Sequence, residues 1–246
     1  MYLTPKADNF PPISGYNCNI ALLSSAFDKI MSEFTKNWRP SHSGTAAVFL
    51  ADRADELRSA LRIQDPSLVA ARSGVSWLPL GAQRGEFHIL FWGGDCVFSF
   101  PDLKGYNAGG EPLPVFQEAL LLYYLVTADG APLRGNWVSF ADLPNGRAYN
   151  AAFQGYSGDE ISKRFGLNLD GFSQACLKAG GRSLQIGSSS YAFQALPRMP
   201  LLAAYWLGDE EFPSSCKILF DEAACHYLPI DACAVLGGML TRKIIK

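Results

Sequence analysis

The chain has 246 residues, of which 48% are hydrophobic and 18% are charged, and its 21 Lys and Arg residues against 23 Asp and Glu residues give a formal charge of −2 at pH 7. These proportions exclude a disordered or fibrous chain, and the lack of a concentrated basic stretch argues against a nucleic acid partner. No apolar run approaches the roughly 20 residues of a membrane span, and residues 1–15 do not resemble a signal peptide. We therefore expect a cytoplasmic protein without a membrane span.

Apolar residues at helical spacing predict helices over 19–36 and 52–63. Asp65 and the proline after it begin a third helix, which ends at Gly74. The N-terminal third of the chain is therefore predicted to be mainly helical.

Strand patterns begin after Val75. Segments rich in β-branched, aromatic and other apolar residues, separated by Gly, Ser and Pro, predict strands over 86–92, 96–100, 137–140, 182–186, 191–196, 201–207 and 216–220. The first two strands form a hairpin with a glycine-rich turn, and the last four suit an antiparallel meander. Further helices are expected over 113–126, over 157–165 with Ser157 as the N-cap, over 169–178, and from Pro229 to the C-terminus.

These elements predict an α+β fold in which one or more mainly antiparallel sheets pack against helices, with a helical N-terminal third and a C-terminal helix. The length allows a single domain over 1–246 or two packed halves of about 1–150 and 151–246. Whether the strands form one sheet or two stays open, because local periodicity does not encode pairing order.

A run of acidic residues provides the first candidate site. The strand over 201–207 leads directly into Asp209, Glu210 and Glu211. Clustered carboxyl groups can serve acid–base chemistry or bind cations, and Arg198 is a candidate counter-charge or anchor for an anionic substrate. An exposed, solvated hairpin loop is the alternative interpretation.

Aromatic residues provide a second set of candidates, with Trp206 and Tyr106 as examples that could line a pocket for a flat ligand. Core packing explains most aromatic side chains equally well. No phosphate-binding loop of the GxxxxGK[ST] type and no GxGxxG turn is present, so the sequence offers neither standard cradle for a nucleotide. The identity of any cofactor is left open.

Six cysteines are dispersed without CxxC spacing, and a chain of this length does not depend on disulfides, so we expect mostly buried thiols. Cys225 and His226 lie next to an acidic stretch and could bind a soft or borderline metal ion. Their spacing matches no known ligand pattern, and Cys225 and Cys233 could instead be small apolar groups at the start of a helix.

Several stretches of the sequence resemble an uncharacterised domain-of-unknown-function family found mainly in anaerobic bacteria and archaea. They include VFSFPD at 97–102, LVTADGAPL at 125–133, LPRMP at 196–200 and WLGDEEFP at 206–213. The resemblance extends from about Ala51 to the C-terminus.

The resemblance implies an accessory binding domain that recognises a cofactor or a redox partner, such as a corrinoid protein, in anaerobic or one-carbon metabolism. Some family members carry an added four-cysteine iron–sulfur domain. This chain has only Cys18 in its N-terminal region, so an iron–sulfur cluster cannot be transferred to it.

Two other functions remain as alternatives. The first is an enzyme with an unfamiliar site built from the carboxylates of 209–211. The second is a homo-oligomeric interaction scaffold, suggested by Gly237 and Gly238 in the last helix, since glycine permits close approach of two backbones at a cost of about 1 kcal/mol relative to alanine. The oligomeric state is not predicted.

Overall fold

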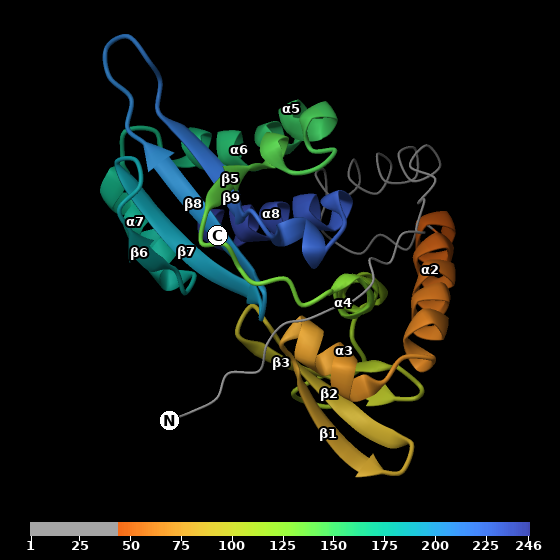
Figure 1. Cartoon of the computed structure of the whole chain (residues 1–246). Helices are drawn as coiled ribbons and strands as arrows, with labels where there is room; N and C mark the ends of the chain where they lie inside the picture. Colours follow the sequence, from red (N-terminus) through yellow and green to blue (C-terminus); the bar gives the residue numbers. More distant parts are fainter. Residues whose placement is uncertain (1–43) are drawn as a thin grey trace, which may run out of the picture. The chain divides into compact units, whose positions relative to one another are not determined.

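The computed structural model describes residues 44–246, with side chains from residue 53 onwards (Figure 1). These residues belong to one compact unit, His42–Lys246. The helix predicted over 19–36 lies outside the described residues. Within them, the structure confirms the α+β class and the antiparallel pairing, and it contains two sheets.

Sheet A has four antiparallel strands in the order β1-β2-β3-β4 and carries α2, α3 and α4 beside it. Alternate residues of β2 and β3, including Phe87, Ile89 and Phe98, are buried, as the two-residue period of a strand requires. The elements of this part are α2 (Gly44–Arg62), α3 (Pro66–Ser73), β1 (Ser76–Gly81), β2 (Arg84–Phe91), β3 (Gly94–Phe100), β4 (Gly105–Asn107) and α4 (Val115–Thr127).

The predicted limits of α3 are confirmed, together with their chemistry. The Asp65 carboxylate accepts a hydrogen bond from the Ser67 N–H at 2.8 Å, which caps the first turn. Gly74 ends the helix in the left-handed conformation, with φ of 71°, and its N–H donates to the Ala70 carbonyl.

A charged network joins α2 to α4 and to the end of β3. The Arg58 guanidinium donates to Glu118 at 2.6 Å and to the Leu103 carbonyl at 3.1 Å. The other Glu118 oxygen accepts from the Gly105 N–H at 2.8 Å. Because both side chains are largely buried, these bonds are needed to offset the loss of hydration.

Sheet B has five strands in the order β5-β9-β8-β7-β6, so the predicted meander of the last four strands is confirmed. One face packs on the helices α5 to α8, and Figure 1 shows these helices grouped along the sheet. The elements are β5 (Trp137–Ser139), η1 (Phe140–Asp142), η2 (Arg147–Tyr149), α5 (Asn150–Tyr156), α6 (Gly158–Phe165), α7 (Leu169–Lys178), β6 (Arg182–Leu184), β7 (Ser189–Leu196), β8 (Met199–Trp206), β9 (Ser215–Asp221), η3 (Ala224–His226) and α8 (Ile230–Ile245).

The two faces of sheet B differ in what they contact. Phe220 packs against Phe153 of α5, and Tyr205 packs against Phe172 of α7, with ring centroids 5.9 and 4.7 Å apart. On the opposite face, Leu202 and Ala204 are covered by a set of partly buried apolar side chains: Trp137, Leu184, Ile186, Ala192 and Trp206.

Several details differ from the sequence prediction. Strands β1 and β4 and helix α5 were not predicted. Ser157 does occupy the N-cap position of α6, but its hydroxyl donates to the Phe153 carbonyl of the preceding helix instead of accepting an N–H. Gly237 serves contact within the chain, since a Cβ atom there would lie 2.5 Å from the Phe153 ring. The glycine in α8 therefore needs no second copy to explain it.

The two sheets meet where the turn of sheet A's central hairpin reaches the end of β7. The Trp92 N–H donates to the Ala195 carbonyl at 2.9 Å, and the Lys243 ammonium of α8 lies 5.5 Å from the Trp92 ring centroid. Trp92 has a φ of 51°, an unfavourable value for a bulky residue. The contact between the sheets therefore fixes a strained turn.

A second link passes through Tyr124, a fully buried residue of α4. Its hydroxyl donates to the Ser73 carbonyl at 2.5 Å and accepts the Arg198 N–H at 2.9 Å. One side chain thus ties the end of α3 to the turn between β7 and β8.

We expect Tyr124→Phe to destabilise the protein by about 1–3 kcal/mol, because it leaves a buried carbonyl and a buried N–H without their partner. Chemical denaturation of the variant and the wild type would measure this loss. Tyr191→Phe is the matched control, since Tyr191 is also buried and its hydroxyl makes no hydrogen bond with a described residue. Equal losses in the two variants would contradict the role given to the Tyr124 hydroxyl.

Candidate functional site

The residues that the sequence suggested for an anionic-substrate site lie at opposite ends of one strand. Arg198 is in the turn before β8, whereas Asp209, Glu210 and Glu211 follow its other end. The eight residues of β8 separate them by roughly 25 Å, at about 3.3 Å per residue. The structure therefore does not bring Arg198 and the three carboxylates together.

The acidic loop has its own structural explanation. One oxygen of the Asp209 carboxylate accepts the N–H groups of Glu211 and Phe212 at 2.9 and 2.8 Å. These two bonds, from Phe212 first and then Glu211, lower the pKa of Asp209 below its usual value. Glu210 and Glu211 are exposed, so the loop is a solvated hairpin with an internal turn.

Trp206 and Tyr106 lie on different sheets. Trp206 ends β8 and belongs to the apolar cluster on the face of sheet B opposite the helices. Tyr106 is in β4, the last strand of sheet A, where it pairs with Val97 and with Pro112. The two aromatic residues do not line one pocket.

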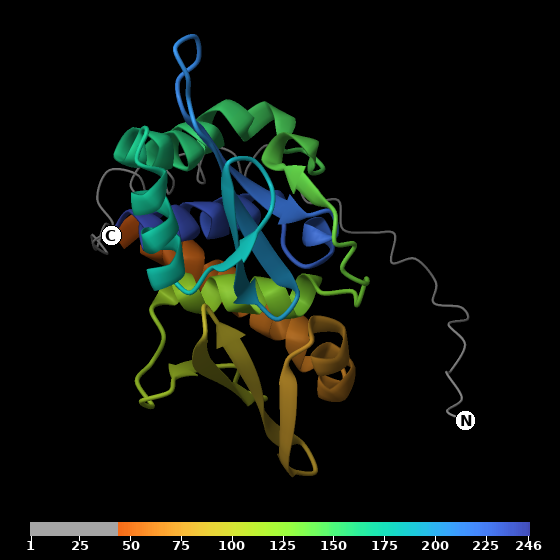
Figure 2. The same ribbon diagram turned by 90° about the vertical axis from the view of Figure 1, so that its left-hand side faces the viewer.

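Arg198 instead lies at the junction of the two sheets. Its backbone N–H is bound to Tyr124, and its side chain packs on the end of α3, where a Cβ atom at Gly74 would lie 3.0 Å from its Nε. Figure 2 shows α3, the end of α4, the β7–β8 turn and the segment before α8 on one side of the unit. We call Arg198, Tyr124, Tyr227, Asp129 and His226 the junction cluster.

The two tyrosines of the junction cluster lie with their ring centroids 6.1 Å apart. The Tyr227 hydroxyl donates to the Ala131 carbonyl. Burial raises the pKa of both hydroxyls, and the positive charge of Arg198 acts in the opposite direction on each. Arg198 is therefore close enough to both to affect their ionisation.

His226 and Asp129 are hydrogen-bonded at the edge of the cluster, with His226 Nδ1 2.7 Å from Asp129 Oδ2. Both side chains are about half exposed. The pair joins η3 to the segment after α4, and it leaves the other ring nitrogen of His226 without a bond to a described residue.

A buried carboxylate supports the same segment. Asp221, at the end of β9, accepts the N–H groups of Arg134, Gly135 and Ala223 at 2.8 to 3.0 Å. Three backbone donors satisfy this carboxylate, so it is a structural residue that joins the segment before β5 to the residue just before η3.

Cys225 and His226, the candidate metal ligands, do not gain further ligands. Among residues 44–246, no group of three or more His, Cys, Asp or Glu side chains is arranged to hold a metal ion. His226 is paired with Asp129, and the Cys233 thiol donates to the Leu228 carbonyl. The geometry gives no support to a metal centre here.

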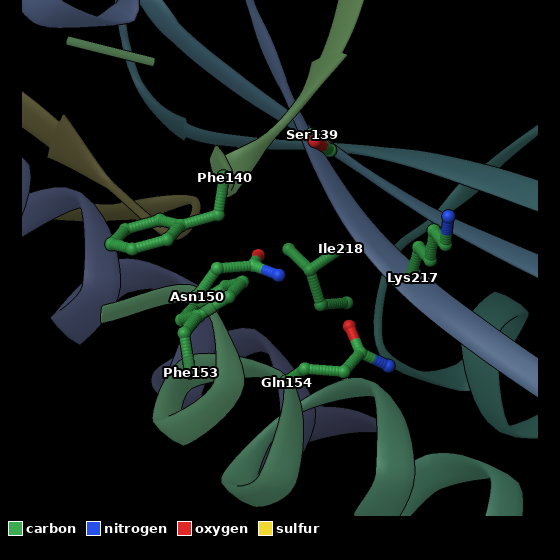
Figure 3. A pocket seen from close by; sticks show the side chains of 7 residues that line it. All are labelled: Ser139, Phe140, Asn150, Phe153, Gln154, Lys217 and Ile218. Atoms are coloured by element: carbon green, nitrogen blue, oxygen red, sulfur yellow. The ribbon is translucent and has the colours of Figure 1, made fainter. Parts of the chain in front are cut away.

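Figure 3 shows a pocket between β9 and the segment from β5 to α5. Phe140, Phe153 and Ile218 form its apolar part, and its volume is about 170 Å³. Pockets for drug-sized ligands usually measure about 300–1,000 Å³. The remaining lining residues are Ser139, Asn150, Gln154 and Lys217.

The polar groups at this pocket are mostly engaged elsewhere. Ser139 Oγ donates to Asp142 at 2.6 Å, and Gln154 Nε2 donates to the Cys216 carbonyl at 2.7 Å. The ammonium group of Lys217 points away from the phenyl rings (Figure 3). Neither the volume nor the polar groups of this pocket mark it as a ligand site.

The sequence suggested only Arg198 and His226 of the junction cluster. Tyr124, Tyr227 and Asp129 were missed because their partners are distant in the chain: 74 residues separate Tyr124 from Arg198, and 97 separate Asp129 from His226. The stretches LVTADGAPL and LPRMP, which contain Asp129 and Arg198, were the one available signal.

No helix among residues 44–246 has the length and apolar character needed to cross a membrane. No curated protein and no solved structure matches this sequence. The sequence profile described as Domain of unknown function (DUF3786) matches residues 65–243, which include both sheets and every residue of the junction cluster. The chain therefore belongs to the DUF3786 family.

Proposed function

We propose that this chain is an accessory binding domain that recognises an anionic group of a cofactor or of a redox partner at the junction cluster. The family resemblance suggests anaerobic metabolism, corrinoid-linked or one-carbon, as the setting. Carboxylate and phosphate are the two anionic groups that the chemistry of the cluster would accept.

The unpaired guanidinium of Arg198 carries this proposal. Arg198 is partly buried, yet it forms no ion pair within 4.0 Å with any carboxylate among the described residues. Arginine presents several N–H donors in a planar arrangement that matches carboxylate and phosphate oxygens. An anionic ligand would supply the partner that the fold does not.

A second arginine supports the same interpretation. The Nε of Arg72, near the end of α3, is buried without a hydrogen-bond partner among the described residues, whereas its Nη2 donates to the Gln64 side-chain oxygen at 2.7 Å. The stem of Arg72 packs beside Gly130, one residue after Asp129. Arg72 thus borders the segment between α4 and β5, and Arg198 lies beside Gly74 at the end of the same helix, α3.

The binding function is favoured over a carboxylate enzyme because the acids of 209–211 are remote from Arg198. The Asp129–His226 pair could take part in proton transfer, but its accessible imidazole nitrogen is also a hydrogen-bond partner for a bound ligand.

We expect inorganic phosphate, pyrophosphate or citrate, compared at constant ionic strength, to raise the melting temperature of the wild-type protein. A ligand at 100 times its Kd adds about 2.7 kcal/mol to the free energy of unfolding. Arg198→Gln removes the guanidinium and keeps the backbone N–H that Tyr124 binds, so this variant should fold and lose the shift. Arg182→Gln, at an exposed arginine of β6, is the control and should keep it. A shift that survives in Arg198→Gln would overturn the proposal.

The natural ligand is sought by anaerobic purification of the untagged protein, followed by absorption spectroscopy and native mass spectrometry on the same sample. We expect a chromophore or an added mass in the wild type and its loss in Arg198→Gln. A featureless spectrum together with an unliganded mass would count against a tightly bound cofactor and leave a protein partner as the occupant to be tested.

The acidic loop should behave differently. We expect Asp209→Asn to keep the anion response and to lower stability at about pH 6, because the carboxylate accepts its two N–H bonds more strongly than an amide does. Because folding lowers the pKa of Asp209, its carboxylate stabilises the folded state at pH values above the unfolded pKa, and this stabilisation is lost as the pH falls through the folded-state pKa. The difference in stability between the wild type and Asp209→Asn should therefore shrink toward about pH 2.5. Denaturation midpoints at the two pH values measure this. Glu210→Gln is the control, and an equal pH-dependent difference in both variants would contradict it.

A further inference from the structure

The hairpin between β8 and β9 projects from sheet B and carries an exposed phenylalanine. Figures 1 and 2 both show this loop extending beyond the helices that cover the sheet. Phe212 is 67% exposed and Leu207 is 44% exposed. Residues 207–214 include three acidic residues and no basic residue. The hairpin therefore presents apolar and negatively charged groups together.

Hydrogen bonds within the loop fix its conformation. The Asp209 N–H donates to the Phe212 carbonyl at 2.9 Å, and the Asp209 carboxylate accepts the N–H groups of Glu211 and Phe212. The Gly208 N–H donates to Ser214 Oγ at 2.8 Å. A side chain on an ordered loop loses less conformational entropy on binding than one on a flexible loop. Phe212 is therefore well placed to contact a second protein surface.

The face of sheet B opposite the helices is apolar at its centre. Leu202 and Ala204 are covered there by side chains that are themselves partly exposed: Trp137, Leu184, Ile186, Ala192 and Trp206. Gly187 packs against Trp206, since a Cβ atom at this glycine would lie 3.1 Å from the indole ring. Apolar side chains grouped on one face are typical of a surface that binds another protein.

The exposed charges on this face are positive. Cross-strand partners share one face of a sheet, so the pairs Arg182–Ala192 and Lys217–Ala204 place both basic side chains beside the apolar centre. Both are exposed, and neither forms an ion pair with a described residue. Asp221 shares the face, but it is buried and its carboxylate is satisfied by backbone N–H groups. The face is therefore apolar with a basic border.

A nearby acid, Asp142, does not neutralise Lys217. The Asp142 carboxylate accepts the hydroxyl and the N–H of Ser139 at 2.6 and 3.2 Å. These two bonds are the main causes that lower the pKa of Asp142, and the charge of Lys217 adds a smaller effect. The Lys217 ammonium therefore stays available to a carboxylate outside the chain.

We infer that two copies of this chain form a two-fold dimer in which the β8–β9 hairpin of each copy lies on the open face of sheet B of the other. A second copy is the occupant because one chain carries both complementary surfaces, an acidic hairpin with an exposed phenyl ring and an apolar face with a basic border. In a two-fold interface the same two surfaces meet twice. The inference does not depend on Arg198, which precedes β8, whereas the hairpin follows it.

The spacing along the strands permits this arrangement. With the two-fold axis beside Trp206 and across the strands, each hairpin extends over the last residues of the partner's β8. Lys217 pairs with Ala204, two residues before Trp206, which is roughly 7 Å along the strand at about 3.3 Å per residue. Glu210 lies four residues beyond Trp206, so the hairpin is long enough to reach Lys217 of the other copy.

The first test is the mass of the full-length protein in solution, measured by sedimentation equilibrium from low to high micromolar concentration. We expect a reversible dimer. A wild type that stays monomeric over the whole range would overturn the inference. Open polymers that grow with concentration would also overturn it, because a two-fold interface closes on itself.

Phe212→Ser tests the contribution of the hairpin. Loss of the phenyl ring should raise the dissociation constant of the dimer at least about tenfold, because aromatic anchors carry much of the binding energy of an interface. Leu167→Ser is the matched control, since Leu167 is 72% exposed between α6 and α7 and should not affect the dimer. Circular dichroism and melting temperature verify that both variants fold. Equal dissociation constants for Phe212→Ser and the wild type would overturn the inference.

A charge exchange tests which two surfaces meet. Glu210→Lys and Lys217→Glu should each weaken the dimer, because each places like charges opposite one another at both symmetric contacts. The double variant restores opposite charges and should dimerise more tightly than either single variant. Lys178→Glu, at an exposed lysine of α7, is the control and should behave like the wild type. Losses that add in the double variant would show that the hairpin and the face do not meet, and would overturn the inference.

Discussion

The hydroxyl group of Tyr124 is the point on which the junction of the two sheets depends. It lies in a fully buried position and both donates and accepts a hydrogen bond, to the end of α3 and from the turn before β8. A buried hydroxyl without partners would cost free energy, so these two segments must stay in register with α4 for the fold to be stable. This requirement sets the backbone position of Arg198.

Asp221 performs the corresponding task for the other half of the junction cluster. Its three backbone donors come from Arg134 and Gly135 before sheet B and from Ala223 just before η3. Asp129, His226 and Cys225 lie on the two segments that this carboxylate joins. Since Asp221 is the last residue of β9, the position of this strand sets the positions of the two segments. The site residues thus lie on irregular segments, but a helix and a central strand of the fold hold those segments in place.

Local chemistry determined which parts of this fold could be predicted. The limits of α3 depend on Asp65 and Gly74 alone, and the hairpin of β2 and β3 on its alternating apolar residues. Strand β1 was missed because nearly all its residues are exposed and it contains Pro79, so no alternation was visible. Helix α5 lacks an apolar stripe. Its Phe153 stacks on Phe140 with centroids 4.3 Å apart, and its Gln154 donates to the Cys216 carbonyl. The pairs of the junction cluster join residues far apart in sequence, which no local pattern contains.

The hydrogen bonds of the junction do not use the side chain of Arg198, which packs beside Gly74. The bond to Tyr124 uses the backbone N–H of residue 198, which any residue except proline would supply. Pro197 already restricts the backbone of this turn. A partly buried guanidinium loses hydration and gains no described carboxylate in return. An alkyl or amide side chain would avoid that cost at no loss to the hydrogen bonds of the turn, and the proposed binding of an anion would offset it.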